Sequence, residues 1–359
     1  MGAGPFQTYA SHTWVVRSGW VISGDGMYST TIQMVGSVSG LSLDVDVFKS
    51  DPNVSTDNVV IQNLAIDCNW NNLTNKPVGP GGEYAVSSGG VILFGTNNLV
   101  QSVRCSNAYG SFETAVGNCE SLVIALYPSK FADAVGNTIS NCLVDSPQGT
   151  HMAPFGIGGL SDFSGATITY NTGAKVLGCT AIGVNNGLGS TPTNPVVGFN
   201  NSGGVNFGYV KNLTIDSNTF IDCYGAAYCD TGSTDGLQVT NNTVIRGWAA
   251  IGLGSPTPPK QNILISGNSF SIQNRSSGAN AGINWTGAPI TNFTVTHNTL
   301  SADTSGSGSL QFWGVIAYSV TNATITNNVV DPLFYNKVTG TGLTISNNTQ
   351  PNGAPVDGL

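Results

Sequence analysis

The chain reads Asn212-Leu-Thr-Ile-Asp-Ser-Asn-Thr-Phe-Ile221 near its middle, and close copies of this stretch recur to its C-terminal end. The copies open at steps of 24, 26, 30, 30 and 20 residues, at Gly236, Asn262, Asn292, Asn322 and Gly342. Within each copy apolar and polar residues alternate, so Leu213 and Ile215 are predicted to point inward and Thr214 outward. A unit this short can bury its apolar face only against its neighbours, which is typical of a β-solenoid.

An Asn recurs at the seventh position of each copy, where the strand is expected to turn: Asn218, Asn242, Asn268, Asn298, Asn328 and Asn348. Asn tolerates left-handed backbone, and its amide can bond the equivalent amide one coil further on. We therefore predict a buried ladder of hydrogen-bonded amides. Glycosylation is the other interpretation of an Asn-rich chain, but Asn218, Asn268 and Asn298 do not begin Asn-x-Ser/Thr sequons.

A second set of short apolar strands precedes these copies, at 90–94, 122–126, 155–158, 205–208, 227–230, 251–253, 283–285 and 315–317. Together the two sets predict an all-β parallel solenoid of about eight to ten coils, each with three short strands. We expect one domain over 1–359, with irregular first coils over 1–60 and a C-terminal tail at 350–359. Two long insertions, 69–88 and 181–202, are expected to wall a binding groove.

Four of the seven cysteines lie 37 residues apart, at Cys68, Cys105, Cys142 and Cys179, and Cys223 follows in a similar context. We predict that they fill one inward position on successive coils as small buried side chains, in preference to forming disulfides. No Cys-x-x-Cys pair and no Cys/His metal spacing occurs, so a zinc site is not expected. No cofactor is predicted, and although calcium could bind outward Asp residues, no Asp cluster is dense enough to indicate it.

Charge is sparse: the chain has 11 Lys plus Arg, a net charge of −8 and only 8% charged residues among 359. These values argue against nucleic acid, anionic membranes and strongly anionic polymers as main partners. No apolar run is long enough to span a bilayer. We expect a secreted or extracellular protein whose export signal is missing from the sequence.

The start of the chain carries a further sign, Val21-Ile-Ser-Gly-Asp-Gly26 followed by Ser29-Thr-Thr-Ile32. With the strand and Asn-turn spacing, it resembles the pectate-lyase-like superfamily of right-handed parallel β-helix proteins, over nearly the whole chain. The resemblance implies a polysaccharide partner and a monomer or homotrimer. The superfamily includes polysaccharide lyases, glycoside hydrolases, phage tailspike depolymerases, epimerases and adhesins, so it does not fix an activity.

None of the superfamily's best-known catalytic motifs is present. The Asn-Thr-Asp, Asp-Asp, His-Gly and Arg-Ile-Lys of polygalacturonases do not occur, nor does the Arg-x-Pro-x-x-Arg of pectate lyases. No catalytic residue can be transferred from the resemblance, which implies only that the groove follows the strand set of 205–208 and 227–230. If alternate residues of that set point inward, one outward row remains: Asn206, Tyr228, Asp230, Gly252 and Asn284.

Asp230 is the outward carboxylate of this row, and Asp235 follows five residues later. Glycoside hydrolysis needs an acid and a second carboxylate roughly 5–10 Å apart, so these two are the predicted catalytic pair. The alternative is ordinary turn chemistry, because Asp is favoured at turns. His151 is a third catalytic candidate beside the groove. Glu113 joins Asn206, Tyr228 and Asn284 as a predicted substrate-binding residue.

Three functions are therefore open. The first is a glycoside hydrolase acting on a neutral or weakly charged polysaccharide. The second is a polysaccharide lyase acting on a uronate polymer, for which Lys211 and Arg246 are the available basic groups near the repeats. The third is a non-catalytic glycan-binding, adhesive or structural solenoid, suggested by an outward threonine row: Thr167/Thr169, Thr214, Thr240, Thr294/Thr296, Thr324/Thr326 and Thr344.

Overall fold

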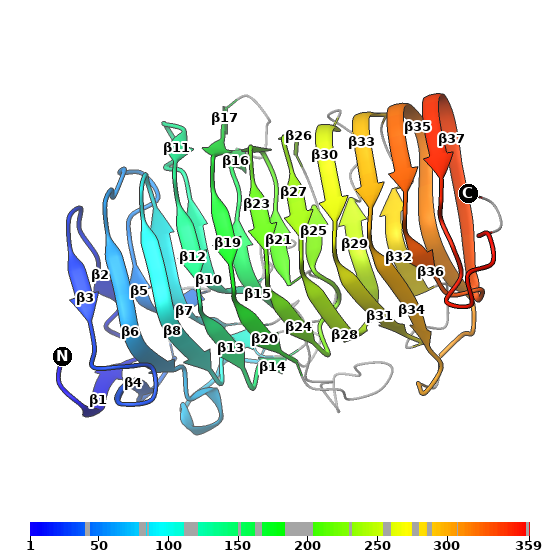
Figure 1. The fold of residues 1–359 in the computed structure, drawn as a ribbon. Coiled ribbons are helices and arrows are strands. Elements are labelled where there is room, and N and C mark those ends of the chain that lie inside the picture. The colour runs from blue at the N-terminus through cyan, green and yellow to red at the C-terminus, as the bar shows by residue number, and fades with distance from the viewer. Residues whose placement is uncertain are drawn as a thin grey trace.

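The chain winds into a long stack of coils, with the two termini at opposite ends of the stack (Figure 1). The computed structural model describes residues 1–39, 44–78, 84, 86–110, 121–149, 152–161, 167–183, 204–229, 232–253, 260–274, 280–285, 289–306, 308–356 and 359. Among these, 35 strands join one continuous sheet whose pairings between coils are parallel, and two further strands form a small sheet. The predicted all-β, right-handed parallel β-helix is confirmed.

Three faces run the length of the solenoid, and each is a ladder of parallel strands. Face A consists of β2 (Trp14–Val15), β5 (Asp44–Lys49), β7 (Ser87–Phe94), β10 (Ser121–Tyr127), β15 (Met152–Ile157), β21 (Val205–Phe207), β25 (Ala227–Cys229), β29 (Ala249–Leu253), β32 (Asn280–Trp285) and the first parts of β35 (Phe312–Thr326) and β37 (Phe334–Ser346). This ladder has eleven strands, where eight to ten coils were expected.

Face B follows face A along the chain in each coil. It consists of β3 (Val21–Ser23), β6 (Val60–Asp67), β8 (Leu99–Ser106), β12 (Thr138–Ser140), β19 (Lys175–Leu177), β23 (Thr214–Asp216), β27 (Gln238–Thr240), β30 (Lys260–Ser266), β33 (Ile290–Thr296) and the last parts of β35 and β37. Short strands occupy the corner between faces A and B: β11 (Ala134–Val135), β18 (Asn171–Thr172), β22 (Val210–Lys211) and β26 (Thr234–Asp235).

Face C closes each coil. It consists of β1 (Gly4–Tyr9), β4 (Thr30–Val35), the last parts of β6 and β8, β13 (Leu143–Asp145), β20 (Thr180–Ile182), β24 (Thr219–Ile221), β28 (Thr243–Gly247), β31 (Ser269–Gln273), β34 (Thr299–Asp303) and β36 (Val329–Val330). Outside the three faces lie β9 (Tyr109–Gly110), which pairs with β14 (Gln148–Gly149), the antiparallel pair β16 (Leu160–Ser161) and β17 (Ile168–Thr169), and the 3-10 helix η1 (Trp70–Asn72).

The predicted asparagine ladder is confirmed at the corner between faces B and C. Each amide donates to the next along the axis, from Asn218 to Asn242 at 2.9 Å and onward to Asn348, and each is almost completely buried. The left-handed residue is the one before each ladder Asn, for example Ser217 and His297, so the prediction placed that conformation one position too late. Asn is required here because it satisfies buried backbone groups, as when Asn218 accepts the Cys179 N–H at 2.8 Å.

The equal cysteine spacing correctly predicted that the cysteines are buried, but not that they share one position on successive coils. Leu64 pairs with Val103, 39 residues further on, so a 37-residue step slips by two residues in the first coils. Because side chains alternate with a period of two, a slip of two keeps the thiol inside. Cys105 therefore pairs with Ile66 and Val144, and only the last pair of the series, Cys142 and Cys179, stack directly. The six described cysteines are all buried.

These buried thiols are expected to resist alkylation in the folded protein. Burial raises the pKa values of Cys68, Cys105 and Cys142, because a thiolate would lose its hydration. Since the thiolate is the reactive form, iodoacetamide at mildly alkaline pH should label them at least about a hundredfold more slowly in the native protein than in urea. Peptide mapping by mass spectrometry measures this site by site. Equal labelling of Cys142 in both conditions would contradict the buried assignment.

The structure describes parts of the segments that the sequence analysis singled out. Residues 1–60, expected to be irregular, contain β1 to β5 in register with the next coil. In the 69–88 insertion the buried Trp70 of η1 stacks on Tyr109, with ring centroids 4.2 Å apart, so this part of the insertion packs against the solenoid. Most of the 181–202 insertion lies outside the described residues. In the C-terminal tail, Thr349 bridges Pro355 and Val356 is buried.

The threonine row is confirmed in the last coils and wrong at its start. Thr294, Thr324 and Thr344 are register partners on face B. Thr169 instead belongs to β17 and is buried, while Lys175 and Leu177 take the corresponding places on β19. No helix in the described part of the chain is long and apolar enough to cross a membrane.

Candidate functional site

The predicted outward row of face A is confirmed for all of its described members. Asn206 pairs with Tyr228, Tyr228 with Gly252, and Gly252 with Asn284, so these residues lie side by side on consecutive coils. Their neighbours in sequence point inward as expected, because Val205, Phe207, Ala227, Cys229, Ile251 and Ile283 are all buried.

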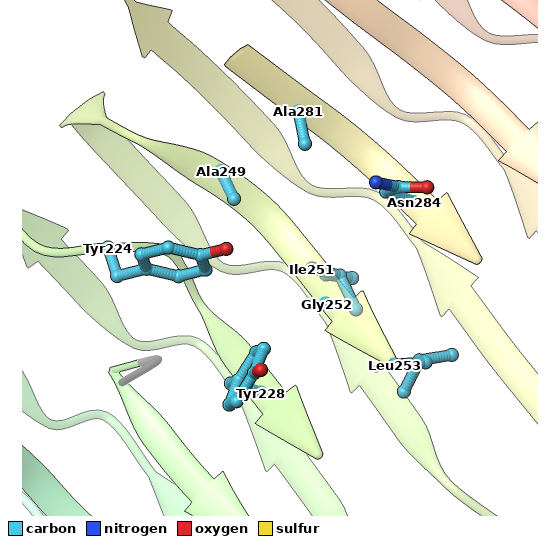
Figure 2. A pocket seen from close by; sticks show the side chains of 8 residues that line it. All are labelled: Tyr224, Tyr228, Ala249, Ile251, Gly252, Leu253, Ala281 and Asn284. Carbon is cyan, nitrogen blue, oxygen red and sulfur yellow. The ribbon is translucent and has the colours of Figure 1, made fainter. Parts of the chain in front are cut away.

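A hollow of about 160 Å³ opens over this row and is shown in Figure 2. Small residues make its floor, with Ala249 and Gly252 on β29 and Ala281 on β32, because they leave the sheet without bulky side chains at that point. Tyr224 and Tyr228 stand on one side and Asn284 on the other (Figure 2). A hollow this size is smaller than the roughly 300–1,000 Å³ of drug-sized pockets. It suits one sugar ring of a longer chain better than a large cofactor.

The two tyrosines meet edge to face, with ring centroids 5.6 Å apart and planes at 72°. Tyr224 also contacts Trp248, with ring centroids 5.8 Å apart, so a third ring packs against the first. Burial raises the pKa of Tyr224, which keeps its hydroxyl protonated at neutral pH. Such paired rings offer flat apolar faces with polar edges, which match the C–H-lined faces and hydroxyl edges of a pyranose.

Gly252 holds the Tyr228 ring in place. A Cβ at this position would lie 2.6 Å from Tyr228 Cδ2 and 2.9 Å from Cε2, so the ring rests directly on the glycine backbone. Gly252 is not at a positive φ, and the requirement for glycine is therefore steric. The sequence pattern placed Gly252 in the outward row, and the structure shows that the Tyr228 ring packs on it.

Asn284 supplies the polar rim of the hollow. Its Oδ1 is buried and has no hydrogen-bond partner within the described structure. A buried polar atom without a hydrogen-bond partner lowers stability by about 1–3 kcal/mol. A conformational change that brought a hydrogen-bond donor to Asn284 Oδ1 would therefore be favoured. None of the described lining residues carries a formal charge. The described lining of the hollow is thus polar at its rim and uncharged.

The predicted catalytic residues are not assembled at this hollow by the described structure. Asp235 lies on β26 at the corner between faces A and B, and its two carboxylate oxygens accept hydrogen bonds from Gln261 at 2.9 Å and Asn262 at 2.7 Å. Those contacts fit the turn interpretation. Asp230, His151 and Glu113 lie outside the described residues, so their roles stay predictions.

Sequence reasoning missed Tyr224, Trp248, Ala249 and Ala281. The first two lie at the corner between faces C and A, just before each face A strand, where the alternation that identified the row does not extend. An aromatic residue recurring just before successive strands, as in Cys223-Tyr224-Gly225 and Gly247-Trp248-Ala249, was the available signal.

The basic groups near the repeats are already engaged. The Lys211 ammonium lies over the Tyr170 ring at 4.1 Å from its centroid. Arg246 binds Asp222 through two hydrogen bonds of 2.9 and 2.8 Å. Among the described residues, no group of three or more His, Cys, Asp or Glu side chains gathers as a metal site would require.

Several solved structures are similar to this chain. The chain is similar to the A-module of the Azotobacter vinelandii mannuronan C-5 epimerase AlgE6, at 13% identity over 98% of this chain and 90% of that one, with a TM-score of 0.53. Endopolygalacturonase I from Stereum purpureum is 13% identical over 97% and 94%, with a TM-score of 0.54. The Streptococcus pneumoniae surface adhesin PfbA is 11% identical over 98% and 84%, with a TM-score of 0.57.

No protein-family model matches the chain, and no curated protein matches it either. At these identities the solved structures establish the fold. The chain has the right-handed parallel β-helix fold, as the sequence analysis predicted.

Proposed function

We propose that the protein is carbohydrate-active and binds a neutral or weakly charged polysaccharide on face A, with the hollow at Tyr228 as a sugar subsite. The observation that carries this proposal is the pair of edge-to-face tyrosines beside a floor of small residues and an uncharged amide rim. Similar solved structures include an epimerase named for mannuronan and an endopolygalacturonase bound to galacturonate, which supports a glycan partner. We further propose an extracellular location and a monomer or homotrimer.

We propose glycoside hydrolysis as the reaction. Asp230 directly follows β25, the strand that carries Tyr228, and we propose it as the catalytic carboxylate on this sequence position. Its partner has to be a second acid roughly 5–10 Å away. The carboxylate of Asp235 accepts hydrogen bonds from two amides, those of Gln261 and Asn262. A lyase is less well supported, because Lys211 and Arg246 are bound elsewhere.

Product chemistry tests the reaction. The protein is incubated with neutral and acidic polysaccharides, and reducing ends are measured together with the ultraviolet absorbance of unsaturated uronates. A hydrolase is expected to release reducing ends without that absorbance, and Asp230→Asn to lose release while keeping glycan affinity. Absorbance would show a lyase instead. Glycan binding without any product would support the non-catalytic binder and contradict the proposed enzyme.

A non-catalytic binder is the second candidate, and a specific surface favours it. On face B of the last three coils, three rows of hydroxyl side chains are in register: Thr291, Thr321 and Thr341; Thr294, Thr324 and Thr344; Thr296, Thr326 and Ser346. Thr is also simply a good residue for a β-surface. Replacing Thr324 by Val keeps the shape and removes a hydroxyl from the centre of this array. Weaker adhesion to a glycan-coated surface would then support the binder.

A further inference from the structure

The row that forms the floor of the hollow continues beyond it as aromatic side chains. Ala249 pairs with Ala281, Ala281 with Trp313, and Trp313 with Tyr335, so all four share one line along the solenoid axis. Figure 2 shows the Ala249 and Ala281 side chains at the hollow itself. We propose that the glycan path extends from the hollow over Trp313 and Tyr335, and that the ligand is an extended chain of several neutral sugar units. This inference rests on the proposed function.

The orientation of the two rings follows from their neighbours. Phe312 and Phe334 precede them in the same strands, are 1% and 5% exposed, and contact each other in the core at 5.4 Å between ring centroids. Because side chains alternate along a strand, Trp313 and Tyr335 point outward. Tyr335 is 57% exposed and Trp313 is partly exposed. Large aromatic rings are usually buried, and exposed rings side by side are typical of interaction sites.

The spacing fits a polymer that lies along the axis. Neighbouring strands lie about 4.8 Å apart, close to the length that one hexose adds to an extended chain. From β25, which carries Tyr228, to β37, which carries Tyr335, the ladder takes four steps, or roughly 19 Å. A monosaccharide fills the hollow alone, whereas an oligosaccharide of about four or five units reaches both outer rings.

Charge along this path also favours a neutral chain. Lys337 lies in the adjacent row, where it follows Asn284 and Ile316 in register. Its ammonium lies over the Tyr318 ring, 5.7 Å from the ring centroid, and makes a cation–π contact there. The described part of the path therefore offers rings and amides, and stacking gains affinity with each sugar that lies on a ring.

The test is the dependence of affinity on chain length. Calorimetry measures binding of glucose, xylose and galactose oligosaccharides, from monosaccharide to hexasaccharide, with polygalacturonate oligomers as the acidic comparison. We expect wild-type affinity to rise up to about the pentasaccharide. Trp313→Ala should then weaken pentasaccharide binding about tenfold and disaccharide binding less than about twofold. Tyr335→Ala should show the same selectivity with a smaller loss.

Tyr28→Ala is the matched control, because Tyr28 is 76% exposed in the first coils, far along the chain from the path. It is expected to leave every affinity unchanged, and circular dichroism confirms that each variant is folded. Affinity that does not depend on chain length, or an equal loss for short and long ligands in Trp313→Ala, would overturn this inference alone. No wild-type binding to any glycan overturns the proposed function and this inference with it.

Discussion

Asn268→Leu is expected to lower the free energy of unfolding by about 3–5 kcal/mol. Asn268 is 2% exposed, and its amide nitrogen donates to the Val239 carbonyl and to Asn298 Oδ1, both at 2.8 Å. Its Oδ1 accepts the Asn242 N–H at 2.8 Å and the Asn242 amide at 3.0 Å. Leu has a similar size but offers none of these bonds. The Val239 carbonyl and the Asn242 N–H on the preceding coil, and Asn298 Oδ1 on the following coil, would each lose a hydrogen bond.

Urea unfolding, monitored by circular dichroism, measures the change in the free energy of unfolding. The slope of the transition is compared between the variant and the wild type, and it shows whether the coils still unfold together. Gln238→Ala is the control, because Gln238 is an exposed amide on β27, next to the same ladder. It should change stability by no more than about 0.5 kcal/mol. A loss in Asn268→Leu no larger than in this control would show that the ladder does not stabilise the fold.

The fold was predictable because its determinants are local and repeated. Every copy from Asn212 onward carries the same alternation, and each must stack on the next, so one pattern fixes strand, face and neighbour at once. The number of residues in each coil was harder to predict from the sequence. In the first half, cysteines at 37-residue steps suggested a register that the 39-residue pairing of Leu64 with Val103 replaces. A shift of two residues leaves the burial pattern unchanged, so alternation alone cannot detect it.

The site was predictable only where it lies on the strands. Tyr228 and Asn284 follow from alternation on face A, and their register is as expected. Tyr224 lies at a corner, where the chain leaves the period of two, and its contact with Tyr228 depends on how that corner packs. The steric role of Gly252 depends on the rotamer of a neighbouring ring, which no single-sequence pattern specifies.

Gly252→Val is expected to weaken glycan binding by about a hundredfold while leaving the protein folded and about as stable as the wild type. Its side chain would occupy the floor of the hollow and displace the Tyr228 ring, because even a Cβ would lie 2.6 Å from that ring. The backbone tolerates the change, since φ is not positive and Val favours strands. This variant should therefore lose glycan affinity but keep its stability, which distinguishes a defect of the site from a defect of folding.

Gly156→Val is the matched control for this experiment, because Gly156 lies in the same row as Asn206 and Tyr228 but outside the hollow. A Cβ there would also meet side chains, at 2.7 Å from Leu122 Cδ1 and 3.0 Å from the Tyr127 hydroxyl, so the steric demand is comparable. Calorimetry with the oligosaccharide bound most tightly by the wild type, and thermal unfolding of all three proteins, give the two readouts. Unchanged affinity in Gly252→Val would move the glycan away from the Tyr228 hollow, whereas equal losses in both variants would assign the effect to general disturbance of face A.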